Sequence, residues 1–221
     1  MKLDAKSLDT RGNGIPFKFY TAYYVSLYSG MQAKTLRQLL EGVKAADSRV
    51  LFHHLFHTIR TKHLIPPKYT NDFARWVGEE VGDEDLAAEL SDISGAEPAT
   101  LEDIRREIVE ILEPRADERA GREKFIFVGM EPVVVKTDYV AHTLADFLDL
   151  LEVVPGESIV YHFVTRRVLE GAGRNDFSTW LEKNFGLSEV AAQLSKIDPL
   201  MYNSEEALRA AILRTLKKAL L

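Results

Sequence analysis

A histidine-rich run offers the most reactive group of side chains in this sequence. The run FHHLFHTIRTKH contains His53, His54, His57 and His63. His53 and His57 are four residues apart, so on a helix both would lie on one face and could bind one metal ion. Asp72, His54 or His63 could supply a third ligand. Helical metal motifs of the HExxH type place an acid between the histidines, and this run has none. A metal site made of His53, His57 and Asp72 is therefore an alternative rather than the favoured interpretation.

A second motif, Asn-Asp-Phe-x-x-Trp, occurs at residues 71–76 and again at 175–180. Asn and Asp are preferred helix N-caps because their side-chain oxygens accept hydrogen bonds from the free N–H groups of the first turn. Phe and Trp, three residues apart, would then face the core. This structural interpretation accounts for every residue of the motif, and we favour it. The functional alternative places the carboxylates of Asp72 and Asp176 in a cleft, as bases or ligands.

An aromatic residue followed by histidine also occurs twice, as Phe52-His53 and Tyr161-His162. We expect His53 to bond to Asp72 and His162 to bond to Asp176, which would join one helix to the start of the next. Each pair could serve as a proton-transfer site or as part of a metal site. Because buried polar groups are normally hydrogen-bonded, the structural role is favoured.

These pairs belong to a longer internal similarity. Residues 71–112 align without a gap to residues 175–216. Upstream of them, the segments FKF and AKTL correspond to FIF and AHTL. The sequence thus predicts a polar lead-in at 1–14, a first repeat at 15–113, a charged linker at 114–123 and a second repeat at 124–221. Two homologous units with apolar faces commonly pack about a pseudo-twofold axis, and we expect one compact body.

Each repeat has the same predicted order of elements. Residues 17–28 and 125–136 are aromatic and β-branched, and Gly129 and Pro132 interrupt the second segment, so two short strands joined by a bend are expected in each. Helices follow, the first with Leu36, Leu39, Leu40 and Val43 on one stripe in the first repeat. The predicted class is mostly α, or α+β: two helical repeats, each with a short β element.

Residues found in one repeat only are free to specialise. Tyr20 and Tyr24, with two further tyrosines nearby, could stack on a sugar or base or form a protein interface, although core packing is favoured. Arg166, with Arg167 and Arg174, could bind a phosphate or carboxylate, although a solvated helix face is favoured. Arg105 and Arg209, shared by the repeats, are expected at the surface or at an interface.

Composition excludes several classes of function. The chain has 221 residues, a net charge of -6 and no cysteine. The acidic balance argues against nucleic acid as a partner, and the lack of cysteine excludes disulfides and thiolate catalysis. No apolar run is long enough for a membrane span and no secretory signal is visible, so a cytoplasmic location is expected. No phosphate-binding glycine loop, dinucleotide fingerprint or nucleophile elbow is present.

The repeated segments, AKTLRQLLEGVKAADSRVLFHH with NDFARW and AHTLADFLDLLEVVPGESIVYHF with NDFSTW, resemble an uncharacterised prokaryotic family of unknown function. The resemblance covers nearly the whole chain after residue 14. It implies no catalytic residues, and it implies a link to enzymes of carbohydrate metabolism. We therefore favour a non-catalytic binding or regulatory module that needs no cofactor, whose partner is a small molecule or a protein. The alternatives are a metal-dependent enzyme and a protein-protein assembly module, and homo-oligomerisation is left open.

Overall fold

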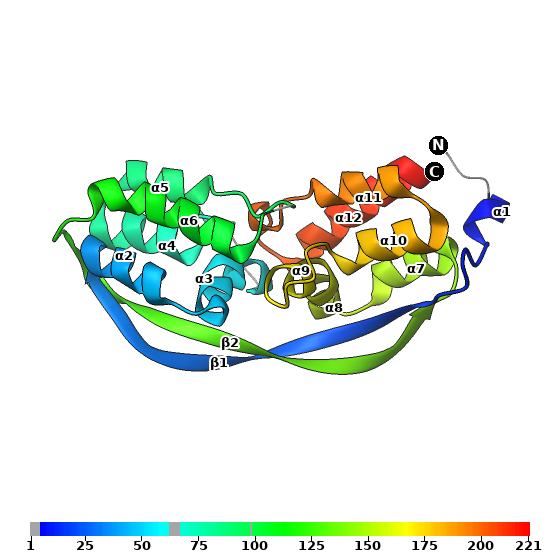
Figure 1. The fold of residues 1–221 in the computed structure, drawn as a ribbon, viewed down its shortest axis with the longest axis horizontal. Helices are drawn as coiled ribbons and strands as arrows, with labels where there is room; N and C mark the ends of the chain where they lie inside the picture. The colour runs from blue at the N-terminus through cyan, green and yellow to red at the C-terminus, as the bar shows by residue number, and fades with distance from the viewer. Residues whose placement is uncertain (1–4, 62–66, 98) are drawn as a thin grey trace.

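The computed structural model describes residues 5–61, 67–97 and 99–221. It has two groups of helices side by side, and a long two-stranded ribbon runs beneath both (Figure 1). A short helix α1 (Ala5–Leu8) precedes the ribbon. No helix within the described ranges combines the length and apolar character that crossing a bilayer requires.

We call the helices between the two strands the N-terminal helix group. Its members are α2 (Leu36–Ala45), α3 (Ser48–Arg60), α4 (Asp72–Trp76), the π-helical turn η1 (Val77–Val81), α5 (Glu84–Ser91), α6 (Leu101–Leu112) and the 3-10 turn η2 (Glu113–Arg115).

The helices after the second strand form the C-terminal helix group. Its members are α7 (Leu144–Val153), α8 (Gly156–Val160), the π-helical turn η3 (Tyr161–Thr165), α9 (Arg166–Val168), α10 (Asp176–Phe185), α11 (Ser188–Ser195), the 3-10 turn η4 (Pro199–Met201) and α12 (Glu205–Leu220). The class is therefore mixed α+β, as predicted.

The β structure is longer than predicted. Strand β1 runs over Phe17–Thr35 and β2 over Ala120–Ala141, paired antiparallel from Phe17 opposite Ala141 to Thr35 opposite Ala120. The prediction of short strands joined by a bend was wrong. Pro132 does not break β2, because in a two-stranded ribbon each strand has an open edge where a missing N–H leaves no bond unmade. The register between β1 and β2 shifts at several places, one of them between Tyr28 and Gln32. Such irregularities allow a two-stranded ribbon to bend.

The strands cross between the helix groups. The start of β1 packs on the C-terminal group, where the Phe17 ring lies 5.4 Å from Phe177 and 5.7 Å from Trp180 between centroids. The indole N–H of Trp180 donates to the carbonyl of Ile15 at 2.8 Å. The aromatic core of the C-terminal group is therefore completed by a strand that begins before the N-terminal group.

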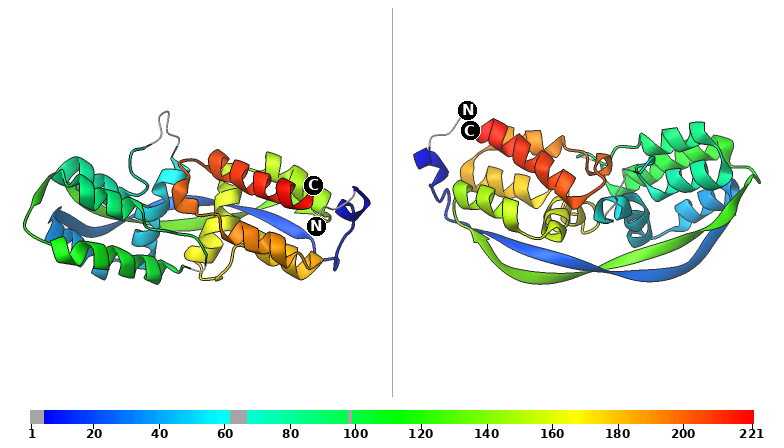
Figure 2. Two further views of the ribbon diagram at one scale, coloured as in Figure 1. Left: turned by 90° about the horizontal axis from the view of Figure 1, so that it is seen from above. Right: turned by 180° about the vertical axis from the view of Figure 1, so that it is seen from behind.

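The start of β2 completes the aromatic core of the N-terminal group. The Phe125 ring lies 5.3 Å from Phe73 and 6.1 Å from Trp76. The indole N–H of Trp76 donates to the carbonyl of Glu123 at 2.9 Å. Because β2 begins at Ala120, the last residues of the predicted linker at 114–123 lie in this strand. Figure 2 shows the ribbon passing under both groups from behind.

The predicted caps are confirmed. The Asn71 side chain accepts from the N–H of Ala74 at 2.9 Å, and Asn175 accepts from Ser178 at 2.8 Å. In each case the Phe and Trp that follow are buried. The predicted stripe of α2 is also confirmed, since all four of its apolar residues are buried against the ribbon and α6.

Arg105 and Arg209 were predicted at the surface or at an interface, and both guanidiniums lie at a contact between two helices. The Arg209 guanidinium is buried and donates to the carbonyls of Leu151 and Val154 at 2.6 Å each. Arg105 donates in the same way to the end of α2, at Val43 and Ala46. Each arginine satisfies carbonyls that the C-terminus of a helix leaves without an intrahelical partner.

Candidate functional site

A histidine-aspartate pair with a buried imidazole joins two helical elements of the C-terminal group to strand β1. The Nδ1 of His162 lies 2.7 Å from Oδ2 of Asp176, as the sequence predicts, and its Nε2 accepts from the backbone N–H of Tyr20 at 2.8 Å. Because Nε2 accepts, the ring proton lies on Nδ1 and is donated to the carboxylate. Burial lowers the pKa of His162, against the opposing effect of Asp176. The imidazole therefore holds η3, α10 and β1 together.

The equivalent pair in the N-terminal group uses His54, not His53. The Nδ1 of His54 lies 2.9 Å from Oδ2 of Asp72, and its Nε2 accepts from the N–H of Val128 at 3.0 Å. The predicted bond between His53 and Asp72 was wrong. Matching the aromatic-histidine dipeptides shifted the alignment by one residue, whereas His54 stands 108 positions before His162, as Tyr20 does before Val128.

Asp72 is held as a carboxylate. Its Oδ1 accepts from the guanidinium of Arg75 at 2.8 Å, while Oδ2 accepts from His54. Burial alone would raise the pKa of Asp72, but the hydrogen bonds and charges of His54 and Arg75 outweigh it and lower the pKa to about 2. This side chain therefore carries a buried negative charge at neutral pH.

A hollow of about 280 Å³ opens beside the His162–Asp176 pair. Four of the candidate binding residues line it, namely Tyr20, His162, Asp176 and Arg166, together with Lys18 and Tyr161. Arg166 uses Nε for Asp176 at 3.3 Å and Nη1 for Glu170 at 2.6 Å. The hydrogen bonds and charges of these acids raise the pKa of Arg166.

The other candidates lie outside this hollow. Tyr24 is nearly buried between the helix groups, where its hydroxyl contacts Thr165 Oγ1 at 2.5 Å and the guanidinium carbon of Arg60 lies 3.8 Å from its ring centroid. Burial raises the pKa of Tyr24 to about 12. His53 and His57 lie on α3, near Asp72 at the start of α4. His63 falls outside the described residues.

Sequence reasoning also missed Lys18 and Glu205, and it misplaced Arg167. Lys18 lies on the rim of the hollow, and nothing in its sequence context marks it. Glu205 faces Glu157 and Arg60 where the helix groups meet, and burial raises its pKa to about 7. Arg167, predicted on a solvated face, is buried and donates to the carbonyls of Gly95 and Ala99.

A hollow at the matching place in the N-terminal group has a different lining. Beside the His54–Asp72 pair it has about 210 Å³ and is lined by Glu79, Glu80 and Glu123 as well as by Arg75. The two hollows therefore differ in charge although their histidine-aspartate pairs are alike. An anion would be repelled by the acidic hollow beside Asp72 and attracted by the hollow beside Asp176, which Lys18 and Arg166 line.

Comparison with known proteins agrees with this fold. The family model described as "Family of unknown function (DUF5752)" matches residues 14–217. The chain belongs to this family. The description assigns the family no function, and none of the curated proteins compared with the chain matches it.

One solved structure is similar over nearly the whole chain. "The structure of OrfY from Thermoproteus tenax" superposes with a TM-score of 0.91 at 58% identity, covering 96% of this chain and 98% of that chain. At this identity the shared fold extends to the strand crossing and to both helix groups.

Proposed function

We propose that the chain consists of two homologous repeats related by a pseudo-twofold axis, and that it is a small-molecule-binding or regulatory module rather than an enzyme. The duplication is supported by contacts that recur 108 positions apart. Tyr20 and Val128 each donate to a histidine, and Ile15 and Glu123 each accept from a tryptophan. The strand of each repeat packs against the helices of the other repeat.

The binding site we propose is the hollow beside His162 and Asp176. The observation that supports it is the set of unused donors around the hollow. Among the described residues, Lys18 Nζ, the hydroxyls of Tyr20 and Tyr161, and Nη2 of Arg166 form no hydrogen bond or ion pair. Donors gathered at one concave place, with aromatic rings beside them, are typical of a ligand site.

The chemistry of the hollow fits a phosphorylated sugar. Two cations would bind a phosphate, Lys18 through its ammonium group and Arg166 through its unused Nη2. The rings of Tyr20 and Tyr161 offer apolar faces and hydroxyls of the kind that sugar rings and sugar hydroxyls contact. The volume, near the lower end for ligand pockets, suits a ligand of this size. His162 is already saturated with hydrogen bonds, which supports binding rather than proton transfer.

The test is a calorimetric titration of the whole chain with glucose 6-phosphate, glucose and inorganic phosphate. We expect the sugar phosphate to bind more tightly than either part. Lys18→Ala and Tyr161→Phe should weaken binding, whereas Lys124→Ala, which alters a lysine of the acidic hollow, should leave it unchanged. At 100 times the dissociation constant, the ligand should add about 2.7 kcal/mol to the free energy of unfolding. Absence of binding, or binding that Lys18→Ala leaves intact, would refute the site.

A second candidate function, assembly with a protein, is favoured by the outer face of the ribbon. Tyr23 and Val25 on β1 and Val133 and Val135 on β2 are large apolar residues that stay exposed. Exposed apolar strands with open edges favour association. Sedimentation of the pure chain tests this function. A mass that rises with concentration, and that Val25→Lys returns to the monomer value, supports it, and a monomer at all concentrations counts against self-association.

A further inference from the structure

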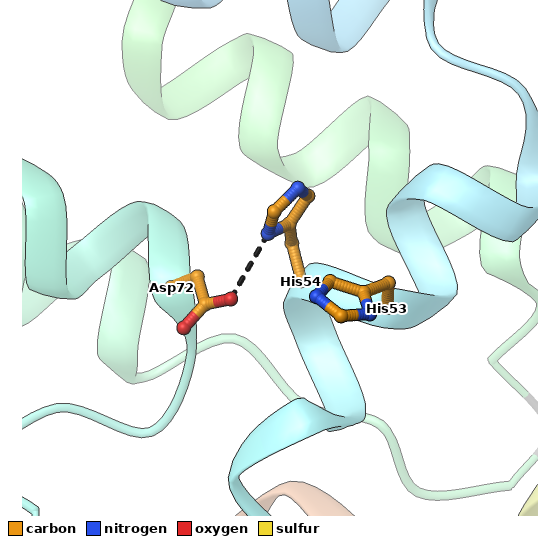
Figure 3. Close-up of side chains that lie close together, drawn as sticks. All are labelled: His53, His54 and Asp72. Atoms are coloured by element: carbon orange, nitrogen blue, oxygen red, sulfur yellow. Dashed lines mark hydrogen bonds and ion pairs between the residues drawn. The ribbon is translucent and has the colours of Figure 1, made fainter. Parts of the chain in front are cut away.

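His53 is a half-buried imidazole that forms no hydrogen bond within the part of the chain that the structure describes. Its ring centroid lies 4.9 Å from those of His54 and His57, and its Nδ1 is buried without a hydrogen-bond partner among the same residues. Figure 3 shows the His53 ring on α3, beside the carboxylate of Asp72 and next to the His54 ring. One potential ligand atom from each of His53, His54 and Asp72 lies within 4.8 Å of the others.

His54 cannot be a metal ligand in this group. Its Nδ1 proton is donated to Asp72, and the lone pair of Nε2 accepts from Val128. Both ring nitrogens are therefore occupied by bonds that also hold β2 against α3. His54 instead fixes the orientation of the carboxylate, which is the role of groups that surround a metal centre.

His57 offers a free nitrogen at the same place. It lies one helical turn after His53, the two rings are stacked with centroids 4.9 Å apart, and its Nδ1 is 3.9 Å from Oδ2 of Asp72. The Thr61 hydroxyl donates to the His57 carbonyl at 3.0 Å and lies 3.2 Å from Nε2. Because that hydroxyl proton is used, Nε2–H donates to Thr61 Oγ1, which leaves the lone pair on Nδ1 facing Asp72.

We propose that His53, His57 and Asp72 bind one divalent transition-metal ion such as Zn²⁺. Ligand atoms bound to one ion at about 2.0–2.2 Å lie at most about 4 Å from each other, so the distance between His57 and Asp72 already fits. The ligand atoms of His53 and Asp72 lie within 4.8 Å of each other, so binding the ion would have to draw the His53 ring closer. Two imidazoles and one carboxylate form a ligand set that binds transition metals in preference to Mg²⁺ or Ca²⁺.

The hydrogen bonds of the group support this site. Nδ1 of His53 is buried and has no hydrogen-bond partner among the described residues, so it is free to coordinate. Arg75 occupies Oδ1 of Asp72, and Oδ2, which accepts one bond from His54, keeps a second lone pair for the ion.

The C-terminal group provides an internal contrast. The pair formed by His162 and Asp176 is present there, but Tyr161 and Thr165 stand 108 positions after His53 and His57. These side chains do not replace two imidazoles as transition-metal ligands. The proposal therefore predicts one metal per chain, although the chain has two histidine-aspartate pairs.

The experiment is a titration of the whole, chelator-treated chain with Zn²⁺ at pH 7.5, followed by calorimetry, and with Co²⁺, followed by its visible absorption. The variants are His53→Ala and His57→Ala, neither of which removes a hydrogen bond between elements. His142→Ala is the matched control, because His142 is exposed and lies outside the group.

We expect one Zn²⁺ per chain, with affinity reduced at least about tenfold in each of the first two variants and unchanged in the control. Co²⁺ should develop ligand-field bands that the same two variants abolish. Two outcomes would overturn the proposal: a titration with no heat beyond dilution, and binding that survives both His53→Ala and His57→Ala. Thermal unfolding without metal shows that each variant remains folded.

Discussion

Replacing His54 by Ala should destabilise the chain far more than replacing the neighbouring His53. His54 is buried, and its ring forms one bond to the ionised Asp72 and a second to the N–H of Val128. A hydrogen bond to a charged group contributes about 1.5–3 kcal/mol, and a buried donor left without an acceptor costs about 1–3 kcal/mol. The variant should therefore lose about 3–5 kcal/mol of the free energy of unfolding. His53→Ala removes no hydrogen bond and should lose no more than about 1 kcal/mol.

Two milder variants separate the two bonds of His54. The amide of His54→Asn can place its nitrogen near the position of Nδ1 and keep the bond to Asp72, whereas His54→Gln can keep an acceptor for Val128. Each should therefore lose less than His54→Ala. Urea unfolding at pH 7, followed by circular dichroism, measures all four free energies. Equal losses in His53→Ala and His54→Ala, or a larger loss in His53→Ala, would refute the assignment of His54 as the partner of Asp72.

Three further variants test the packing and the charges around the helix groups. Burial raises the pKa of Glu205 to about 7, above its unfolded value of 4.5, so the stability it contributes is complete below pH 4.5 and is lost as the pH rises to 7. Glu205→Gln should raise the free energy of unfolding at pH 8 by about 1 kcal/mol, after allowance for its partial exposure, and by nothing at pH 4.5; a gain of equal size at both would contradict this. Gly42→Ala should destabilise by about 1–3 kcal/mol despite alanine's higher helix propensity, because its Cβ would lie 2.2 Å from the Phe127 ring; denaturant unfolding that shows stabilisation would contradict the contact. Arg209→Ala should lower the free energy of unfolding by about 2–4 kcal/mol, because two buried carbonyls, one of them on Leu151, lose their donor. A change below about 0.5 kcal/mol would contradict this, because it would show that water replaces the guanidinium.

Local features of the fold were predictable from the sequence. The caps at Asn71 and Asn175 and the apolar stripe of α2 depend on neighbours within one turn, and side-chain type at fixed spacing is enough to place them. The bond between His162 and Asp176 was also predictable, since each residue belongs to a motif that occurs twice in the sequence.

The long strands and their crossing were not predictable in the same way. Gly129 and Pro132 interrupt the periodicity of a strand, and only pairing with a distant partner, which a single sequence does not reveal, keeps β2 continuous. Arg209 looks like a surface residue on an amphipathic helix because the carbonyls that it satisfies belong to α7. The hollow beside His162 depends on Lys18 and Tyr20, which come from the other end of the chain.

The choice of His54 could have been made from the sequence. The upstream segments align at a constant spacing, and extending that spacing without a shift places His54, not His53, opposite His162. The repeated aromatic-histidine dipeptide was the misleading signal. Its first residue, Phe52, packs on Phe56 within the core for reasons unrelated to the histidine that follows.

The exchange of strands between the helix groups predicts that neither group unfolds alone. The chain has two tryptophans, Trp76 in the N-terminal group and Trp180 in the C-terminal group, and each bonds to the strand segment that completes its core. The most direct measurement is urea unfolding of Trp76→Phe and Trp180→Phe, each followed by the fluorescence of the remaining tryptophan and by circular dichroism. The structure predicts that, within each variant, the two signals change at one urea concentration. A tryptophan transition separated from the loss of helix, in either variant, would show that the groups fold independently and would contradict the account.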